Sequence, residues 1–173
     1  MADLTTDARS LNAFYRPAGS APVTWAMGSL FEQVLSATDS GGALGMALVT
    51  QPPGIATPLH RHTREAEAFF LLDGTMTYRA GDETFHLCGG DFLWLPAGLP
   101  HAFRVTGSIP VRFLGFTSPG GLMALYDEVG VPATERRLPG EDGRSMGEEI
   151  ARWNEVGPRY GLQVVGPPLP GDG

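Results

Sequence analysis

Three histidines and one glutamate carry the clearest chemistry in this chain of 173 residues. His60 and His62 are separated by one residue, Glu67 follows shortly after them, and His101 lies further along the chain. Side chains alternate between the two faces of an extended strand, so His60 and His62 face the same side and can bind one ion. Three imidazoles and a carboxylate suit Fe, Ni, Mn, Cu or Zn and can leave coordination positions open for a substrate or dioxygen.

The segments that must position these ligands are typical of an all-β domain. Between residues 23 and 117, short segments rich in Val, Leu, Phe, Tyr, Trp and Thr alternate with turns rich in Gly, Pro and Asp. The turns Asp73-Gly74 and Gly81-Asp82 each separate two such segments, which predicts consecutive antiparallel hairpins in a meander. Many short strands at this spacing indicate a sandwich or a barrel.

The chain divides into three parts by pattern. Residues 1–22 are polar and end in Pro and Gly, which predicts an irregular N-terminal arm. Residues 23–117 form the predicted β-barrel, and residues 118–173 form a C-terminal helical extension that packs on the barrel within the same domain. The Pro-rich residues 167–171 show no pattern of a stable element.

Two helices are predicted in the C-terminal extension. The first carries apolar residues at helical spacing and ends at Gly130, and the second opens with a capping box formed by Ser145 and Glu148. We expect the apolar stripes of both helices to cover an edge or an end of the barrel. The stripe of the second helix consists of Met146, Ile150 and Trp153.

Charge and composition argue against several classes of protein. The 19 acidic and 12 basic residues give a net charge of -7, and no basic cluster occurs, so we expect no nucleic-acid partner and no membrane partner. Every basic residue is Arg, which excludes a Schiff-base lysine. The N-terminal residues contain no apolar run, which predicts neither a signal peptide nor a membrane anchor and favours a cytoplasmic location. We interpret the single cysteine, Cys88, as a buried and inert thiol.

The spacing of the ligand candidates and of the glycines around them resembles the two conserved motifs of the cupin family. The first motif reads G, five residues, HxH, four residues, E, six residues, G, and the second reads G, five residues, PxG, two residues, H. A tenth position, usually Asn, is Val105 here, and this departure touches no metal ligand. The nine matching positions are Gly54, His60, His62, Glu67, Gly74, Gly90, Pro96, Gly98 and His101.

This resemblance implies a conical barrel of the double-stranded β-helix or jelly-roll type, with one divalent metal ion. It implies that the ligands of the ion are His60, His62, Glu67 and His101. From the residues alone, Glu65 is an alternative to Glu67 because both have the same strand parity, and the cupin pattern favours Glu67. We expect Glu65 to be solvated or paired with an arginine such as Arg61 or Arg64, and His86 to make a structural hydrogen bond.

Within the cupin family, the chain resembles small bacterial cupins of the quercetin 2,3-dioxygenase type. The resemblance implies a metal-dependent dioxygenase that cleaves a flavonol or a related enolic aromatic substrate, with dioxygen as co-substrate. Glu67 would then be both a metal ligand and the catalytic base that takes the proton of the substrate hydroxyl. Because members of the family are commonly dimers, we also expect a homodimer.

Two other classes of function stay open. One is an oxygen-independent, metal-dependent isomerase, cyclase or decarboxylase of a natural-product pathway, in which the metal would act as a Lewis acid. The other is a non-catalytic cupin that binds a small molecule. A thiol dioxygenase is disfavoured because cupins of that group usually lack the first-motif glutamate, which is Glu67 in this chain.

Inward-facing positions on the predicted strands mark candidates for the walls of a substrate pocket. Large apolar side chains at these positions would suit a flat aromatic substrate. The same positions would equally serve as ordinary barrel core, so both interpretations stay open. The candidates are Phe69, Met76, Tyr78, Phe103 and Phe113.

Overall fold

Two antiparallel sheets form the body of the protein, which the computed structural model describes for residues 13–140 and 143–171. The larger sheet has the strand order β11-β1-β2-β3-β10-β5-β8, and the smaller has the order β12-β4-β9-β6-β7. The larger sheet contains β1 (Val23–Ala26), β2 (Ser29–Leu35), β3 (Gly45–Gln51), β5 (Ala66–Asp73), β8 (Phe92–Leu95), β10 (Val111–Ser118) and β11 (Val131–Pro132). The smaller sheet contains β4 (Pro58–His62), β6 (Thr75–Ala80), β7 (Glu83–Cys88), β9 (His101–Val105) and β12 (Leu162–Pro168).

The two sheets share one apolar core. Buried residues alternate along β3 and β10, as expected for strands with one face on a core. The larger sheet contributes Phe69 and Phe113 to this core, and the smaller sheet contributes Tyr78 and Phe103. This arrangement confirms the predicted all-β fold, a double-stranded β-helix barrel followed by short helices.

One of the two predicted hairpins is wrong. β6 and β7 pair as expected across the Gly81-Asp82 turn. β5 and β6 instead lie in different sheets, and Gly74 turns the chain between them with a φ of 81°. A Cβ atom at Gly74 would lie 2.8 Å from the Cα atom of Val111, so this corner requires glycine for its conformation and for space. The predicted meander therefore does not form.

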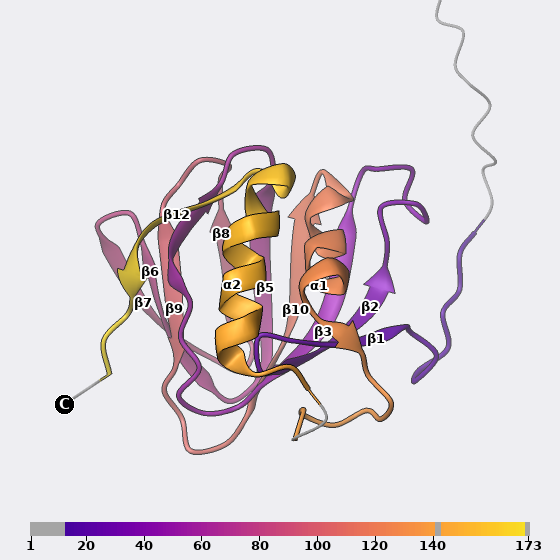
Figure 1. Cartoon of the computed structure of the whole chain (residues 1–173), viewed down its shortest axis with the longest axis horizontal. Helices are drawn as coiled ribbons and strands as arrows, with labels where there is room; N and C mark the ends of the chain where they lie inside the picture. Colours follow the sequence, from indigo (N-terminus) through magenta and orange to yellow (C-terminus); the bar gives the residue numbers. More distant parts are fainter. Residues whose placement is uncertain (1–12, 141–142, 172–173) are drawn as a thin grey trace, which may run out of the picture.

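Two helices of the C-terminal extension pack beside each other against the sheets (Figure 1). They are α1 (Met123–Val129), preceded by the 3-10 turn η1 (Gly120–Leu122), and α2 (Met146–Val156), followed by the 3-10 turn η2 (Gly157–Tyr160). Within the described part of the chain, neither helix has the length and apolarity that crossing a membrane would need. The helices share a second apolar cluster made of Leu122, Leu125, Val129, Trp153, Val156 and Leu162.

The buried face of α2 differs from the predicted stripe. The capping box of Ser145 and Glu148 is confirmed, but Ile150 is 41% exposed and Glu149 is only 2% exposed. The Glu149 carboxylate accepts a hydrogen bond from the backbone N–H of Gly28 at 3.1 Å, which fastens α2 to the turn between β1 and β2. Hydrophobic periodicity does not mark a buried polar residue, and the predicted stripe was shifted for this reason.

Strand β12 corrects the prediction for the end of the chain. Residues 167 and 168 belong to this strand rather than to a tail without a stable element. β12 pairs with β4 and places Leu162 opposite His62 and Val164 opposite His60. Proline is tolerated here because β12 is an edge strand with an irregular register. The tail thus supports the strand that carries two of the ligand candidates.

Cys88 is exposed at the end of β7, so its predicted burial is wrong. A hydrogen bond to Asp91 raises the pKa of the Cys88 thiol, and the negative charge of the same carboxylate raises it further. Both effects favour the protonated thiol, which is a poor nucleophile. The unreactive character expected of Cys88 therefore comes from an acidic neighbour rather than from burial.

Glu149 predicts a pH dependence of stability. Burial raises the pKa of Glu149 above its ordinary value of 4.5, so the folded protein holds this proton more tightly than the unfolded chain. Stability is therefore lost as the pH rises through the raised pKa. Glu149→Gln removes this loss and keeps an oxygen for the Gly28 N–H. We expect the free energy of unfolding of the variant, measured by urea titration, to gain on that of the wild type between pH about 4 and about 7.

The neighbouring Glu148→Gln variant is a matched control with the opposite sign. Hydrogen bonds from Ser145 lower the pKa of Glu148, so its carboxylate contributes stability above the ordinary pKa and loses it as the pH falls. This variant should lose stability relative to the wild type over the same rise in pH. If both variants followed the same trend, the environment assigned to Glu149 would be wrong.

Candidate metal centre and cavity

The four residues predicted to bind a metal meet where the two sheets face each other. His60 and His62 lie on β4, His101 begins the neighbouring strand β9, and Glu67 comes from β5 of the other sheet. All four are buried, with exposed fractions between 2% and 6%. The three histidines offer nitrogen atoms that lie within 4.8 Å of one another. Glu67 Oε2 lies 3.4 Å from His62 Nε2 and 3.3 Å from His101 Nε2.

Backbone carbonyl groups fix the orientation of two of the imidazole rings. The Nδ1 atom of His60 lies 2.7 Å from the carbonyl oxygen of Pro58, and that of His101 lies 2.9 Å from the carbonyl oxygen of Leu99. A carbonyl can only accept, so Nδ1 carries the proton in both rings. Their Nε2 atoms therefore keep a free lone pair, as in histidines that bind metals.

The protonation and hydrogen bonding of the cluster fit a divalent metal ion. Burial lowers the pKa of His60, and the charges of the neighbouring His101 and His62 lower it further, to about 3. The His60 ring is therefore neutral. Burial alone would raise the pKa of Glu67, but the two adjacent histidines, chiefly through positive charge on His62, outweigh burial and lower the pKa below its ordinary value, so this carboxylate favours a cation beside it. The buried Nε2 atoms of His62 and His101 have no hydrogen-bond partner, an unfavourable state that coordination to a cation would relieve.

Glu65 is not part of this cluster. It precedes β5 and is 6% exposed, so the prediction of a solvated carboxylate is wrong. Glu65 makes no direct ion pair with the two predicted partners, because Arg61 bonds to Gln163 and Arg64 bonds to the carbonyl of Arg159. Burial raises the pKa of Glu65, although the charge of Arg64 acts to lower it, and the Oε2 atom of Glu65 has no hydrogen-bond partner.

His86 lies on β7, away from the three clustered histidines. Its side chain is exposed, and its Nδ1 atom lies 3.0 Å from the hydroxyl oxygen of Thr77 on the paired strand β6. This contact agrees with the structural hydrogen bond expected of His86. In the described part of the chain, the histidine cluster that can hold a metal consists of His60, His62 and His101.

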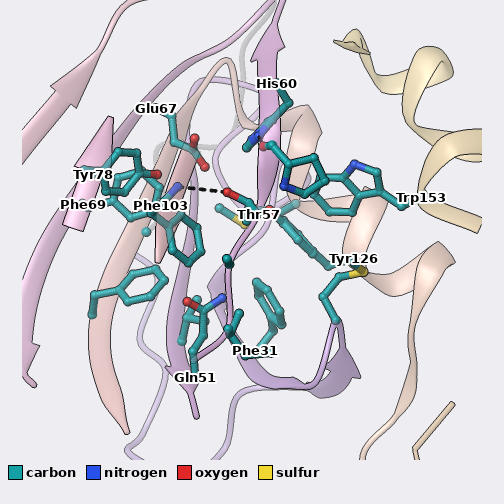
Figure 2. A pocket seen from close by; sticks show the side chains of 18 of the residues that line it. Phe31, Gln51, Thr57, His60, Glu67, Phe69, Tyr78, Phe103, Tyr126 and Trp153 are labelled. Carbon is teal, nitrogen blue, oxygen red and sulfur yellow. Dashed lines mark hydrogen bonds between the residues drawn. The ribbon is translucent and has the colours of Figure 1, made fainter. Parts of the chain in front are cut away.

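The metal centre lies at one end of a mainly apolar cavity (Figure 2). The cavity and its open mouth enclose about 720 Å³ of space that protein atoms do not fill. Four of the five predicted wall residues line it, whereas Met76 is buried in the core outside the lining. The rings of the four pack against one another, with 5.1 Å between the centroids of Phe69 and Tyr78 and 5.4 Å between those of Tyr78 and Phe103.

Part of the cavity wall comes from residues that the sequence did not mark as pocket candidates. Trp153 of α2 lies with its ring centroid 6.1 Å from that of His60, and Tyr126 of α1 stacks on Phe31 of β2 at 4.2 Å. Helical spacing placed Trp153 on the apolar stripe of the second predicted helix. Only the packing of the helices against the sheets shows that Trp153 and Tyr126 line the cavity beside the histidine cluster.

Comparison with known proteins identifies a domain family and several distant relatives. Residues 47–117 match the family model of the cupin domain. The chain is 32% identical over 100 residues to quercetin 2,3-dioxygenase from Bacillus subtilis (strain 168), a match that covers 58% of this chain and 29% of that protein. It is 29% identical over 68 residues to an uncharacterized protein from Methanocaldococcus jannaschii, covering 39% of this chain and 54% of that protein. The chain thus spans only part of the length of either relative.

A solved structure shows the same fold. The predicted oxalate decarboxylase from Thermotoga maritima superimposes with a TM-score of 0.55 at 20% identity, over 62% of this chain and 99% of that chain. At this level of identity, the likeness concerns the fold and not the reaction.

Replacement of a ligand histidine should remove the metal without unfolding the barrel. We expect His62→Ala or His101→Ala, dialysed against Zn(II) and then against buffer, to lose most of the zinc that the wild type retains, because each removes one imidazole from the cluster. Metal content is measured by atomic emission, and folding by circular dichroism. The matched control is His86→Ala, which removes an exposed imidazole and should keep the zinc. Full retention by both ligand variants would refute the assignment.

Proposed function

The chain belongs to the cupin superfamily, and from this premise we propose that it is a metal-dependent dioxygenase that opens a flavonol or a related enolic aromatic molecule. One observation carries the proposal: the buried histidine and glutamate cluster borders an aromatic cavity. His60 and Glu67 line this cavity together with the rings of Phe69, Tyr78 and Phe103. The partial match to a quercetin 2,3-dioxygenase supports the same class of substrate.

The cavity favours a flat, uncharged substrate. Aromatic rings on several sides offer stacking and edge contacts to a planar ring system. Burial raises the pKa values of Tyr78 and Tyr126 well above their ordinary range, and the negative charge of Glu67 adds to this effect. Both tyrosines therefore remain neutral phenols that can donate hydrogen bonds.

The proposed reaction needs no reductant besides the substrate. The two carbon–carbon bonds that flank the hydroxyl-bearing carbon of the flavonol break, and this carbon leaves as carbon monoxide. The lost carbon had joined two other carbons, and each of these forms a bond to one oxygen atom of dioxygen. The product is an ester of an aromatic carboxylic acid. The four electrons that reduce dioxygen come from the substrate carbons, and the hydroxyl proton ends on the product acid.

Glu67 is the proposed base for the hydroxyl proton. Its carboxylate lines the cavity and lies beside the Nε2 atoms of His62 and His101, so a substrate oxygen that approaches the histidines also approaches Glu67. The aromatic walls exclude water from this proton transfer and hold the ring plane toward the cluster. A divalent transition-metal ion in the cluster would supply Lewis-acid activation of the enolic oxygen and, if redox-active, electron transfer between substrate and dioxygen.

Oxygen uptake tests the proposed reaction. We expect protein reconstituted anaerobically with Fe(II), Ni(II), Mn(II), Cu(II) or Zn(II) to consume dioxygen and release carbon monoxide in equal amounts when quercetin is added, with at least one of these ions. Glu67→Gln should slow uptake by at least about a hundredfold, because the substrate proton loses its acceptor. Uptake is followed with an oxygen electrode, and carbon monoxide by its binding to reduced haemoglobin.

A metal-loaded protein that takes up no dioxygen would contradict the dioxygenase proposal. An isomerised, cyclised or decarboxylated product formed without dioxygen would then assign the metal centre to the oxygen-independent class. Binding of the aromatic molecule without turnover would assign it to the non-catalytic class.

A homodimer is part of this proposal, supported by an apolar strip on the edge of the larger sheet. Phe92 and Trp94 of the edge strand β8 are 59% and 54% exposed. Phe92 pairs with Phe70 of β5, which is 38% exposed, so the three rings lie along one outward face. An exposed apolar strip on an edge strand is typical of a surface that associates with another chain.

Light scattering tests the homodimer. We expect the wild type to elute with twice the 18.4 kDa mass of one chain, and Trp94→Asp to shift toward one chain mass because it places a charge within the strip. Ile109→Asp, at a position that is 58% exposed outside the strip, is the matched control and should stay dimeric. A wild-type mass of one chain would contradict the proposal.

A further inference from the structure

Gln51 is a buried polar residue without a hydrogen-bond partner for its side-chain oxygen. It ends β3, where Ala47 and Val49 occupy the preceding inward positions, and it is 5% exposed. The Oε1 atom is fully buried and accepts no hydrogen bond from the protein. Buried side-chain oxygens are paired in most proteins, so an unpaired amide on an otherwise apolar row calls for a partner that the chain does not provide.

The side chain of Gln51 enters the same cavity as the metal centre, at a distance from it. Gln51 is one of the residues that line the cavity, together with Phe31, Ile55 and Phe113. Figure 2 shows Gln51 at the opposite end of the cavity from Glu67 and His60, with aromatic side chains between the two ends. The cavity thus has two polar ends joined by apolar walls.

The other polar groups that line the cavity donate no hydrogen bond to Oε1 of Gln51. The hydroxyl oxygen of Thr57 accepts a hydrogen bond from the backbone N–H of Phe103, as the dashed line in Figure 2 marks. A water molecule beside Gln51 would need two or more polar partners to be held there, and Phe31, Val49 and Phe113 offer side chains without polar atoms. A ligand with its own hydroxyl group satisfies Gln51 without that requirement.

We propose that Gln51 is a specificity-determining residue that accepts a hydrogen bond from a hydroxyl group of the substrate, at the end remote from the metal centre. The orientation rests on the proposed function, which places the enolic oxygen at the histidine and glutamate end. The preferred substrate is then an elongated aromatic molecule with two oxygen-bearing ends, one enolic and one phenolic. A buried acceptor discriminates strongly against ligands that lack the matching donor, because such ligands leave it unpaired.

Binding of matched flavonols tests this inference. The probes are 3-hydroxyflavone and its 4′-hydroxy and 7-hydroxy derivatives, which share the enolic group and differ only in a remote hydroxyl. Zn(II)-loaded protein, titrated in the absence of dioxygen, allows isothermal titration calorimetry without turnover of the flavonol. We expect the wild type to bind one of the two derivatives roughly tenfold more tightly than 3-hydroxyflavone, and Gln51→Met to bind all three equally.

The control variant applies the same change outside the cavity. Gln163→Met replaces an exposed glutamine on β12 and should keep the wild-type preference. The inference is overturned if the wild type binds all three flavonols alike, as it would if Gln51 only held water. It is equally overturned if Gln51→Met keeps the preference.

Two measurements without flavonols separate this inference from the proposed function. If no flavonol binds, the proposed substrate class fails, and phenol and toluene then test Gln51 by itself. Preference of the wild type for phenol, lost in Gln51→Met, would uphold its role, and equal binding would refute it.

Ligand-free Gln51→Met should also melt at a higher temperature than the wild type, because it removes an unpaired buried oxygen. A lower melting temperature would make Gln51 a structural residue and overturn the inference.

Discussion

The structure depends on the burial of three imidazoles and one carboxylate at a single point between two sheets. Removing such groups from water is unfavourable unless they are paired or coordinate a metal. The fold accepts this because each group is held on a paired strand: β4 lies between β12 and β9, and β5 lies between β10 and β8. The carbonyls of Pro58 and Leu99 each accept a hydrogen bond from Nδ1 of one imidazole ring, so Nε2 of that ring stays available for a cation.

The cavity extends the same principle from the metal centre to the substrate. Its walls are apolar, so each polar atom exposed to it carries an energetic cost that a ligand can offset. At one end these atoms are the nitrogen and oxygen atoms of the cluster, and at the other end the atom is Oε1 of Gln51. Rings from both sheets and from both helices hold the space between. The ligand that we propose therefore has two polar ends and a flat middle.

Local pattern predicted most of the strands, because alternation with period two marks them, and it placed His60 and His62 on one face. The choice of Glu67 over Glu65 and the assignment of His101 as a ligand came from the resemblance to the cupin motifs. Asp73-Gly74 was misread because the same residues suit a hairpin and a corner between sheets. β12 escaped prediction because its partner β4 lies about a hundred residues earlier, and pairing over that distance has no local signal. Gln51 escaped because a polar residue at a strand end looks like the start of a loop.

The helices that complete the cavity are separate from the strands that hold the metal centre. α1 and α2 contribute Tyr126 and Trp153 to the cavity wall, but the candidate metal ligands all come from β4, β5 and β9. α2 is fastened to the sheet through Glu149 and Gly28, away from the ligands. Substitutions on the helices at positions other than Trp153, whose ring lies against His60, can therefore change which molecules fit while the geometry of the candidate ligands is kept. Such a division allows one barrel to diverge toward new substrates in evolution, or under directed mutagenesis, without rebuilding its chemistry.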